Sequence, residues 1–228
     1  MTKTIPWNSG GGNITLTYNA SEGNQAIVLS SDSNTSSSAR SQSITFKAGN
    51  VTKSLLVKQE GVQKQQGSIT AIPNGYSSTY SSYQSVNSSY PITRAYTDTS
   101  STTYTTLNCN TGSRASTYLS LSFDLSSIPS NAEITSVSCK FKARVASTSY
   151  INTAEGQLYA NGTAKGSSVS WRSTSTTTIY TITNCGTWTR SELNNLLLRL
   201  TATRGNNQTT RATTINIYGA ELTVNYEY

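Results

Sequence analysis

Residues 116–123 read STYLSLSF, and polar and apolar side chains alternate along this stretch. Successive side chains of a β-strand point to opposite faces of a sheet, so the alternation predicts a strand buried on one face only. The turn-forming sequence DLSSIPSN follows at 124–131, and SVSCKFKARV at 136–145 alternates in the same way. Two half-buried strands joined by a turn are typical of an antiparallel sandwich.

Strand candidates of the same kind recur at regular spacing on both sides of this stretch. They lie at residues 94–97, 104–109, 155–160, 177–183, 196–203 and 214–226. At least eight strands within about 160 residues, separated by Ser-, Asn- and Gly-containing turns, predict a jelly roll or a similar β-sandwich.

The first 62 residues contain a separate set of alternating runs. These runs lie at residues 13–18, 26–30, 43–47 and 54–59. Short strands with Gly, Asn and Ser turns between them predict a small β-sandwich. Residues 63–67, QKQQG, have no apolar side chain and form the predicted linker. The sequence therefore predicts one domain at 1–62 and a second at 68–228.

One short helix is expected within the second domain. Thr189 and Glu192 have the spacing of a capping box, in which the Thr hydroxyl caps the amide three residues on and the Glu carboxylate reaches back. Leucines at 193, 196 and 197 then recur at helical spacing. We therefore expect a helix near 190–196 that runs into a strand at 198–201.

The composition excludes several classes of enzyme. The 228 residues contain no histidine and ten carboxylates, and charged residues make up only 12% of the chain. Without histidine there is no Ser-His triad and no His-ligated metal, and no pair of acids is nominated for glycosidase chemistry. We expect no enzyme activity and no catalytic, cofactor-binding or metal-binding residue. Cys109, Cys139 and Cys185 are expected to be small buried side chains, although one disulfide among them is also compatible with the sequence.

The charge balance is basic but dispersed. The net charge is +7, from seventeen Lys and Arg residues against ten acids. Nucleic-acid binders concentrate their cations in a stripe, whereas the densest run here, Lys140–Arg144, is an alternating strand, so we expect no nucleic-acid partner. No run approaches the ~18 apolar residues of a membrane span, so we expect no membrane partner. Residues 1–7, MTKTIPW, lack the apolar core of a signal peptide, which predicts assembly in a cytoplasm.

Aromatic side chains beside polar ones are candidates for a carbohydrate-contacting surface, because sugars stack on flat rings and hydrogen-bond to amide and guanidinium groups. The candidates are Trp171, Arg172, Tyr76, Tyr80 and Tyr83. Trp171 has the alternatives of a core position or a stack with Arg172. Trp188 is expected to pack beneath the helix cap. The Ser- and Tyr-rich stretch 76–90 has the composition of low-complexity sequence, but its regularly spaced aromatics favour an ordered loop or an edge strand.

The first 62 residues also resemble a known family. Residues 4–7 read TIPW, residues 36–46 read SSSARSQSITF, and residues 57–61 read VKQEG. This series is similar to BACON-type domains, which carry a Ser-Arg-Ser-x-x-Ile-Thr strand and close with Val-x-Gln-x-Gly. The resemblance implies an immunoglobulin-like sandwich of a kind found in proteins of gut bacteria and of their phages.

A second resemblance covers about residues 92–228. Residues 95–98 (AYTD) and 118–137 (YLSLSFDLSSIPSNAEITSV) resemble the strand-turn core of DNRLRE-like jelly rolls. Residues 185–193 (CGTWTRSEL) and 218–224 (YGAELTV) are similar to structural proteins of gut phages. The resemblance implies a non-catalytic module displayed on a cell wall or a virion, and it brings no functional residue to this chain.

These observations predict an all-β protein with a small immunoglobulin-like β-sandwich followed by a jelly-roll β-sandwich with one short helix. The predicted function is structural, on the surface of a phage virion, as a capsid decoration or head-fibre protein anchored by its N-terminal domain. Its expected partners are other virion proteins, above all the major capsid protein, and further copies of itself in a homo-oligomer. The alternative is a carbohydrate-binding adhesion module with host-surface or mucus glycans as partners.

Overall fold

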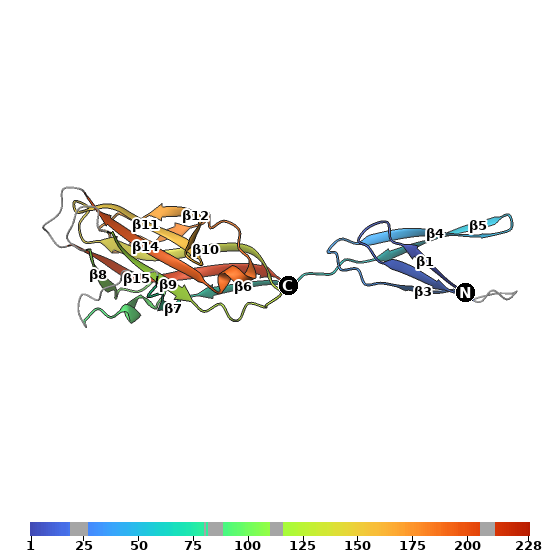
Figure 1. Cartoon of the computed structure of the whole chain (residues 1–228), viewed down its shortest axis with the longest axis horizontal. Coiled ribbons are helices and arrows are strands. Elements are labelled where there is room, and N and C mark those ends of the chain that lie inside the picture. Colours follow the sequence, from blue (N-terminus) through green and yellow to red (C-terminus); the bar gives the residue numbers. More distant parts are fainter. Residues whose placement is uncertain (19–26, 80, 82–88, 110–115, 206–212) are drawn as a thin grey trace. The chain divides into compact units, whose positions relative to one another are not determined.

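The computed structural model describes residues 1–18, 27–79, 81, 89–109, 116–205 and 213–228. Nearly all of their regular structure is antiparallel β-sheet, which confirms the all-β fold class (Figure 1). The chain divides into two compact units, Met1–Gln65 and Gln66–Tyr228. Each unit encloses a hydrophobic core of its own.

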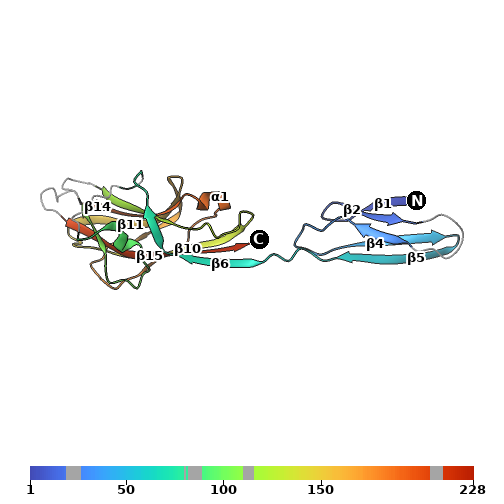
Figure 2. The same ribbon diagram turned by 90° about the horizontal axis from the view of Figure 1, so that it is seen from below.

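The first unit is a small sandwich of a sheet and a hairpin. Its sheet consists of β1 (Thr2–Pro6), β2 (Asn13–Thr17) and β3 (Val28–Ser31), and its hairpin of β4 (Arg40–Ala48) and β5 (Val51–Gln59). The hairpin packs on the sheet through a core of Trp7, Ile14, Leu16 and Ile44 (Figure 2). The four expected strands are present, and the additional strand β1 pairs with β2 along its whole length.

Arg40 is buried in this first unit, with 4% of its surface exposed. Its guanidinium donates hydrogen bonds to the Gly11 and Asp32 carbonyls, both at 2.6 Å, and to Gln59 Oε1 at 2.9 Å. It also lies 4.5 Å from the centre of the Trp7 ring. One side chain therefore joins the hairpin to two loops of the opposite sheet, which lets so small a core hold its layers together.

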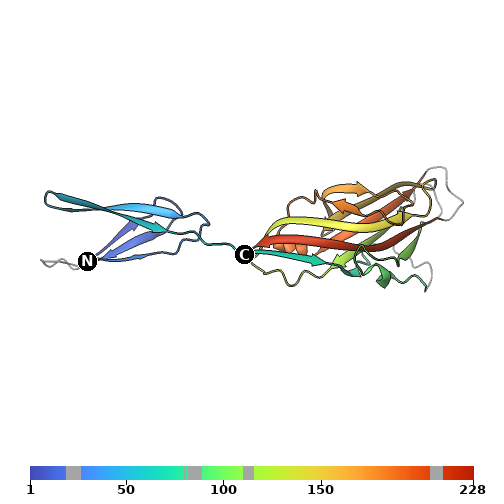
Figure 3. The same ribbon diagram turned by 180° about the vertical axis from the view of Figure 1, so that it is seen from behind.

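The second unit is a sandwich of two five-stranded sheets. The first sheet has the order β13 (Tyr180–Ile182), β10 (Glu133–Val145), β15 (Thr213–Glu227) and β6 (Gln66–Ala71), with β8 (Thr105–Cys109) also pairing with β15. In Figure 3 the red strand β15 lies between the yellow β10 and the teal β6. The second sheet has the order β12 (Thr163–Ser170), β11 (Ile151–Ala160), β14 (Leu196–Arg204), β9 (Ser116–Phe123) and β7 (Pro73–Tyr76).

The path of the chain through the second unit is that of a jelly roll. From β6 to β15 every connection crosses from one sheet to the other, except the hairpin between β11 and β12. Large apolar side chains such as Phe141, Leu158, Leu198 and Leu200, all 0% exposed, fill the space between the sheets. As the alternation of STYLSLSF predicts, Leu119 and Leu121 point into this core.

The prediction of a strand at 94–97 is wrong. Residues Ile92–Ala95 form a short 3-10 helix, η1. Pro91 precedes it with a φ of −63°, and its carbonyl accepts a hydrogen bond from the Arg94 amide at 3.1 Å. The ring of proline fixes a φ suited to the start of a turn, and Ala95 is small enough to be fully buried beneath it.

Strands β6, β7 and β12 have no counterpart among the predicted strands. β12 is an edge strand in which no residue is fully buried, so it shows no apolar alternation. β6 begins at Gln66 and takes in Gly67, two residues that we expected in the linker, and these pair with Glu227 and Tyr226. The ring of Tyr226 occupies the space that a Cβ on Gly67 would need, which explains the glycine at that position.

The expected capping box is present at helix α1 (Arg190–Leu193). The Glu192 amide donates to Thr189 Oγ1 at 3.3 Å, and the Thr189 amide donates to Glu192 Oε2 at 2.8 Å. The helix is shorter than expected, because β14 begins at Leu196. Trp188 is buried beside the cap, as predicted, and donates from Nε1 to the Cys185 carbonyl at 2.8 Å. None of the described helices is long and apolar enough to cross a membrane.

Replacing Thr189 with alanine removes one half of this box. We expect it to destabilise the second unit by about 1 kcal/mol, the usual contribution of an N-cap side chain. In a unit of this size, that corresponds to a fall in Tm of about 2–4 °C by thermal circular dichroism. Thr187→Ala is the matched control, because Thr187 is exposed two residues before the cap and makes no hydrogen bond with the described part of the chain. Equal melting of the Thr189 variant and the wild type would contradict the assigned role of the cap.

Candidate functional site

Three acidic side chains of the second unit, those of Asp98, Asp124 and Glu192, accept hydrogen bonds in turns or in the helix cap. Asp98 accepts hydrogen bonds from the Ser100 hydroxyl at 2.5 Å and the Ser100 amide at 2.8 Å, and these lower its pKa. Asp124 accepts from the Ser126 amide at 3.0 Å, which lowers its pKa in the same way and forms an Asx-turn. The Glu192 pKa is lowered by Lys165, whose ammonium lies 2.8 Å from Oε1, and by the capping amide. Across the described ranges, no three metal-ligating side chains lie close enough together to hold an ion.

The three cysteines are free and buried, as expected for small core side chains. Burial disfavours the thiolate, so it raises the pKa of Cys185 to about 11 and raises those of Cys139 and Cys109 as well. A thiol that stays protonated is a poor nucleophile. The cysteines therefore contribute to packing and not to surface chemistry.

This burial predicts the labelling behaviour of the protein. In the native state at pH 8, we expect Ellman's reagent to leave all three thiols essentially unmodified over an hour. After unfolding in guanidinium chloride, we expect three thiols per chain to react within minutes. The unfolded sample is the control for reagent activity. Fast labelling of the native chain, or fewer than three thiols in the unfolded chain, would contradict the assignment.

Of the residues first nominated for glycan contact, the three that the structure describes do not form one surface. Trp171 is 0% exposed and belongs to the core of the second unit, so its expected contact with sugar is wrong. Arg172 is exposed, but its guanidinium donates to the Ile151 and Thr148 carbonyls, both at 2.6 Å, and supports the loop before β11. Tyr76 is 41% exposed and lines a cavity. Tyr80 and Tyr83 lie outside the described residues.

The basic run at 140–144 is part of the sandwich. Phe141 and Ala143 point into the core, as the alternation predicts. Lys142 is only 8% exposed, because its ammonium donates to the Ser101 carbonyl at 2.8 Å and lies 4.9 Å from the centre of the Tyr218 ring. The run therefore includes a cation that supports a loop.

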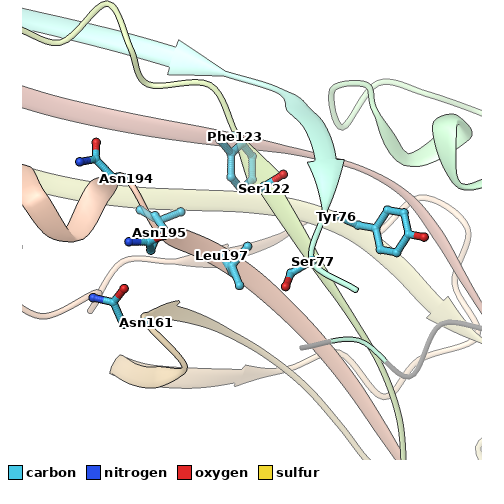
Figure 4. Close-up of a pocket in the computed structure, with 9 residues that line it drawn as sticks. Tyr76, Ser77, Ser122, Phe123, Asn161, Asn194, Asn195 and Leu197 are labelled. Carbon is cyan, nitrogen blue, oxygen red and sulfur yellow. The ribbon is translucent and has the colours of Figure 1, made fainter. Parts of the chain in front are cut away.

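A cavity of about 330 Å³ opens where four connections of the second sheet meet. Tyr76 and Ser77 line it from the end of β7, Ser122 and Phe123 from β9, and Asn161 from the β11–β12 turn. Asn194 and Asn195 line it from the connection between α1 and β14, and Leu196 and Leu197 from the start of β14. Figure 4 shows the three asparagines on one side, Tyr76 and Ser77 on the other, and Leu197 between them. Its volume is at the low end of the range for small-molecule sites.

The turn that carries Asn161 is set by local sequence. Asn161 and Gly162 have φ values of 51° and 80°, and they form a two-residue loop between the paired Ala160 and Thr163. Two successive positive φ values match a type I′ hairpin turn, for which Asn-Gly is the preferred sequence. The turn places the Asn161 side chain at the rim of the cavity.

Next to Leu197, which lines the cavity, a row of side chains lies on the outer face of the second sheet. Leu197 is only 8% exposed but lies outside the hydrophobic core, and it is the cross-strand neighbour of both Ser122 and Tyr159. Two residues further along β14, the Arg199 guanidinium lies 4.0 Å from the centre of the Tyr159 ring and 5.4 Å from that of Tyr118. Arg199 Nε also donates to Ser120 Oγ at 3.2 Å. This stacking holds the Tyr159 ring in place beside the cavity.

Comparison with known proteins adds no family assignment. No family model matches the chain, and no curated protein matches it. The chain is similar to solved structures of infectious bursal disease virus, Gx strain and Gt strain, at 11% and 10% identity. Each match covers 98% of this chain and 69% of the viral chain, with a TM-score of 0.26. This similarity is too low to carry a functional argument, and the BACON and DNRLRE resemblances stay predictions.

The sequence alone nominated only Tyr76 among the residues of the cavity. The Asn-Gly pair at 161–162 is a strong hairpin signal and could have placed Asn161 on a turn. The position of Asn195 beside that turn depends on the register between β11 and β14, in which Ala160 pairs with Leu196. That register joins strands far apart in the sequence.

Proposed function

We propose that this chain is a non-enzymatic structural protein on the surface of a phage virion, as a capsid decoration or head-fibre protein. The observation that carries the proposal is the fold, in which two separately cored β units follow one another. The side chains with structural roles in it include three acids, the three thiols and two buried cations, namely Asp98, Asp124, Glu192, Cys109, Cys139, Cys185, Arg40 and Lys142. A chemically inert β-sandwich with few charges suits a protein whose task is to be displayed.

The strand arrangement of the second unit suits it to attachment by one of its ends, with the other end exposed. Its first strand β6 and its last strand β15 are antiparallel neighbours, and Gln66 pairs with Glu227. The chain therefore enters and leaves this unit at the same end. Attachment there leaves the opposite end and the outer face of the second sheet open to contacts.

The first unit is the proposed anchor. Six cations and three acids lie in residues 1–66, and these are Lys3, Arg40, Lys47, Lys53, Lys58 and Lys64 against Glu22, Asp32 and Glu60. Lys47 and Lys58 are exposed on the face of the hairpin that points away from the core. We propose that this face binds an acidic surface of the major capsid protein, because complementary charge guides such contacts.

We further propose that the chain forms a homo-oligomer, because most virion components occupy closed symmetric sets. Light scattering on the purified chain measures the number of copies directly. A closed dimer or trimer supports this part of the proposal. A monomer at concentrations up to the millimolar range would overturn it and leave the anchor proposal unaffected.

The anchor proposal is tested with particles of the phage whose genome encodes the chain. Genes for capsid, portal and terminase beside this gene identify that phage. Particles that lack the protein are mixed with the purified full chain, and bound chain is measured after sedimentation. We expect Lys47→Glu with Lys58→Glu to weaken binding at least tenfold, and Lys140→Glu, an exposed change in the second unit, to have no such effect. Failure of the wild-type chain to co-sediment would overturn the proposal.

A carbohydrate-binding role is the second candidate. The cavity beside Tyr76 favours it, because asparagine amides and aromatic rings are combined there in one concave site. The two roles are compatible, since a displayed virion protein can also contact glycans of a host surface or of mucus.

A further inference from the structure

We propose that the cavity between Tyr76 and the β11–β12 turn binds a neutral glycan, and that the adjoining Tyr159 carries the next sugar residue. This site replaces the Trp171 surface, and the inference rests on the carbohydrate-binding candidate and goes beyond the proposed virion role. The two proposals are independent, because sugar binding is measured on the purified chain without particles.

The polar side of the cavity fits sugar hydroxyls. The side-chain amides of Asn161 and Asn195 are exposed and make no hydrogen bond with the described part of the chain. A third amide, that of Asn194, accepts from Arg190 Nη1 at 2.9 Å through Oδ1 and keeps its own donor group. Each asparagine offers both donors and an acceptor. A sugar hydroxyl is also both donor and acceptor, so adjacent hydroxyls can pair with the two ends of one amide.

The apolar side of the cavity fits the C–H faces of a sugar ring. Tyr76 presents an exposed ring at the rim, and Leu197 and Phe123 provide apolar surface between the polar groups. The Tyr159 ring lies beside Leu197 across the strand pair, where it is fixed by the Arg199 guanidinium. Ordered aromatic rings cost little entropy on binding, which favours their use as stacking platforms.

The charge of the lining argues for a neutral ligand. Apart from the phenol of Tyr76, the described residues that line the cavity have no ionisable side chain. An anionic sugar, a phosphate or a nucleic acid would require a cation that contacts it directly. Two guanidiniums lie close to the lining, and both have partners within the protein. Arg190 donates to Asn194 Oδ1 and to the Ile128 carbonyl, and Arg199 lies over the Tyr159 and Tyr118 rings and donates to Ser120. The site is therefore suited to a ligand that it contacts through hydroxyl and C–H groups and that carries no charge.

The test uses the purified full chain and a panel of neutral oligosaccharides of glucose, galactose, mannose and N-acetylglucosamine. Sialylated and sulfated oligosaccharides are the charged comparators. Saturation-transfer NMR detects weak binding, and calorimetry measures affinity for the best neutral sugar. We expect at least one neutral sugar to bind, and the charged comparators to bind no better than their neutral cores.

Two substitutions examine the site itself. Asn195→Ala removes an exposed amide, and Asn161→Asp keeps a residue that tolerates positive φ while it removes the amide donor. We expect each to weaken binding at least tenfold without a change in Tm. Asn152→Ala, at an exposed asparagine of β11 away from the cavity, is the matched control and should bind as the wild type does. Absence of binding to all neutral sugars, preference for the charged ones, or unchanged affinity of both site variants would overturn the proposal.

Discussion

Replacing Trp171 with alanine is expected to destabilise the second unit by about 3–5 kcal/mol, the usual cost of truncating a buried tryptophan. Trp171 is 0% exposed, lies directly after β12, and is among the largest fully buried side chains of the protein. Its removal leaves a void in the core that the surrounding side chains cannot fill without moving. In a unit of about 160 residues the fall in Tm is on the order of 10 °C.

Thermal unfolding of the Trp171→Ala variant measures this effect. Trp171→Phe is the control, because it keeps most of the buried apolar area and because the indole Nε1 has no hydrogen-bond partner to lose. We expect it to melt between the alanine variant and the wild type. A Trp171→Ala chain that melts like the wild type would show that the side chain is not in the core. Loss of sugar binding in this variant would report unfolding and not a lost contact.

Arg40→Ala is expected to unfold the first unit and leave the second one folded. The substitution removes the donor from three carbonyls, those of Gly10, Gly11 and Asp32, and from the Gln59 side chain. It also removes the cation from the Trp7 ring. Breaking such a buried set costs about 3–5 kcal/mol. A core of this size rarely supplies more than about that amount of net stability. The loss is therefore comparable with the whole stability of the first unit.

Hydrogen exchange read by mass spectrometry separates the two units. We expect amides of β1, β2, β4 and β5 to lose protection in the Arg40→Ala chain, and those of β9, β10 and β14 to keep it. Lys58→Ala, an exposed change on the same hairpin, is the control and should keep both sets protected. Unchanged protection in the first unit would contradict the assigned role of Arg40. Loss of protection in both units would contradict the expectation that the second unit stays folded when the first one unfolds.

Strand β9 could be predicted from the sequence, whereas β12 and β6 could not. STYLSLSF alternates because β9 has the core on one side and solvent on the other, and residues 116–123 are the strand that the structure contains. β12 is exposed on both faces, so burial leaves no pattern in it. β6 is defined mainly by its pairing with β15, and the paired residues are more than 150 positions apart in the sequence.

The candidate site was harder to predict than the fold. Trp171 follows a strand of small polar residues, and nothing in that context indicates which way its ring points. The structure buries it and brings Tyr76, Asn161 and Asn195 together instead. These residues come from connections that meet only because β7, β9, β14 and β11 are neighbours in one sheet. The capping box, by contrast, depends on residues three apart, and local spacing sufficed to predict it.

The central claim is that this chain is a structural component of a virion surface. Quantitative mass spectrometry of gradient-purified particles tests it most directly, with the major capsid protein as the internal reference. The account predicts that the chain is present at a fixed ratio to the capsid protein, and that an antibody against it binds intact particles. Its presence in infected cells together with its absence from purified particles would contradict the account.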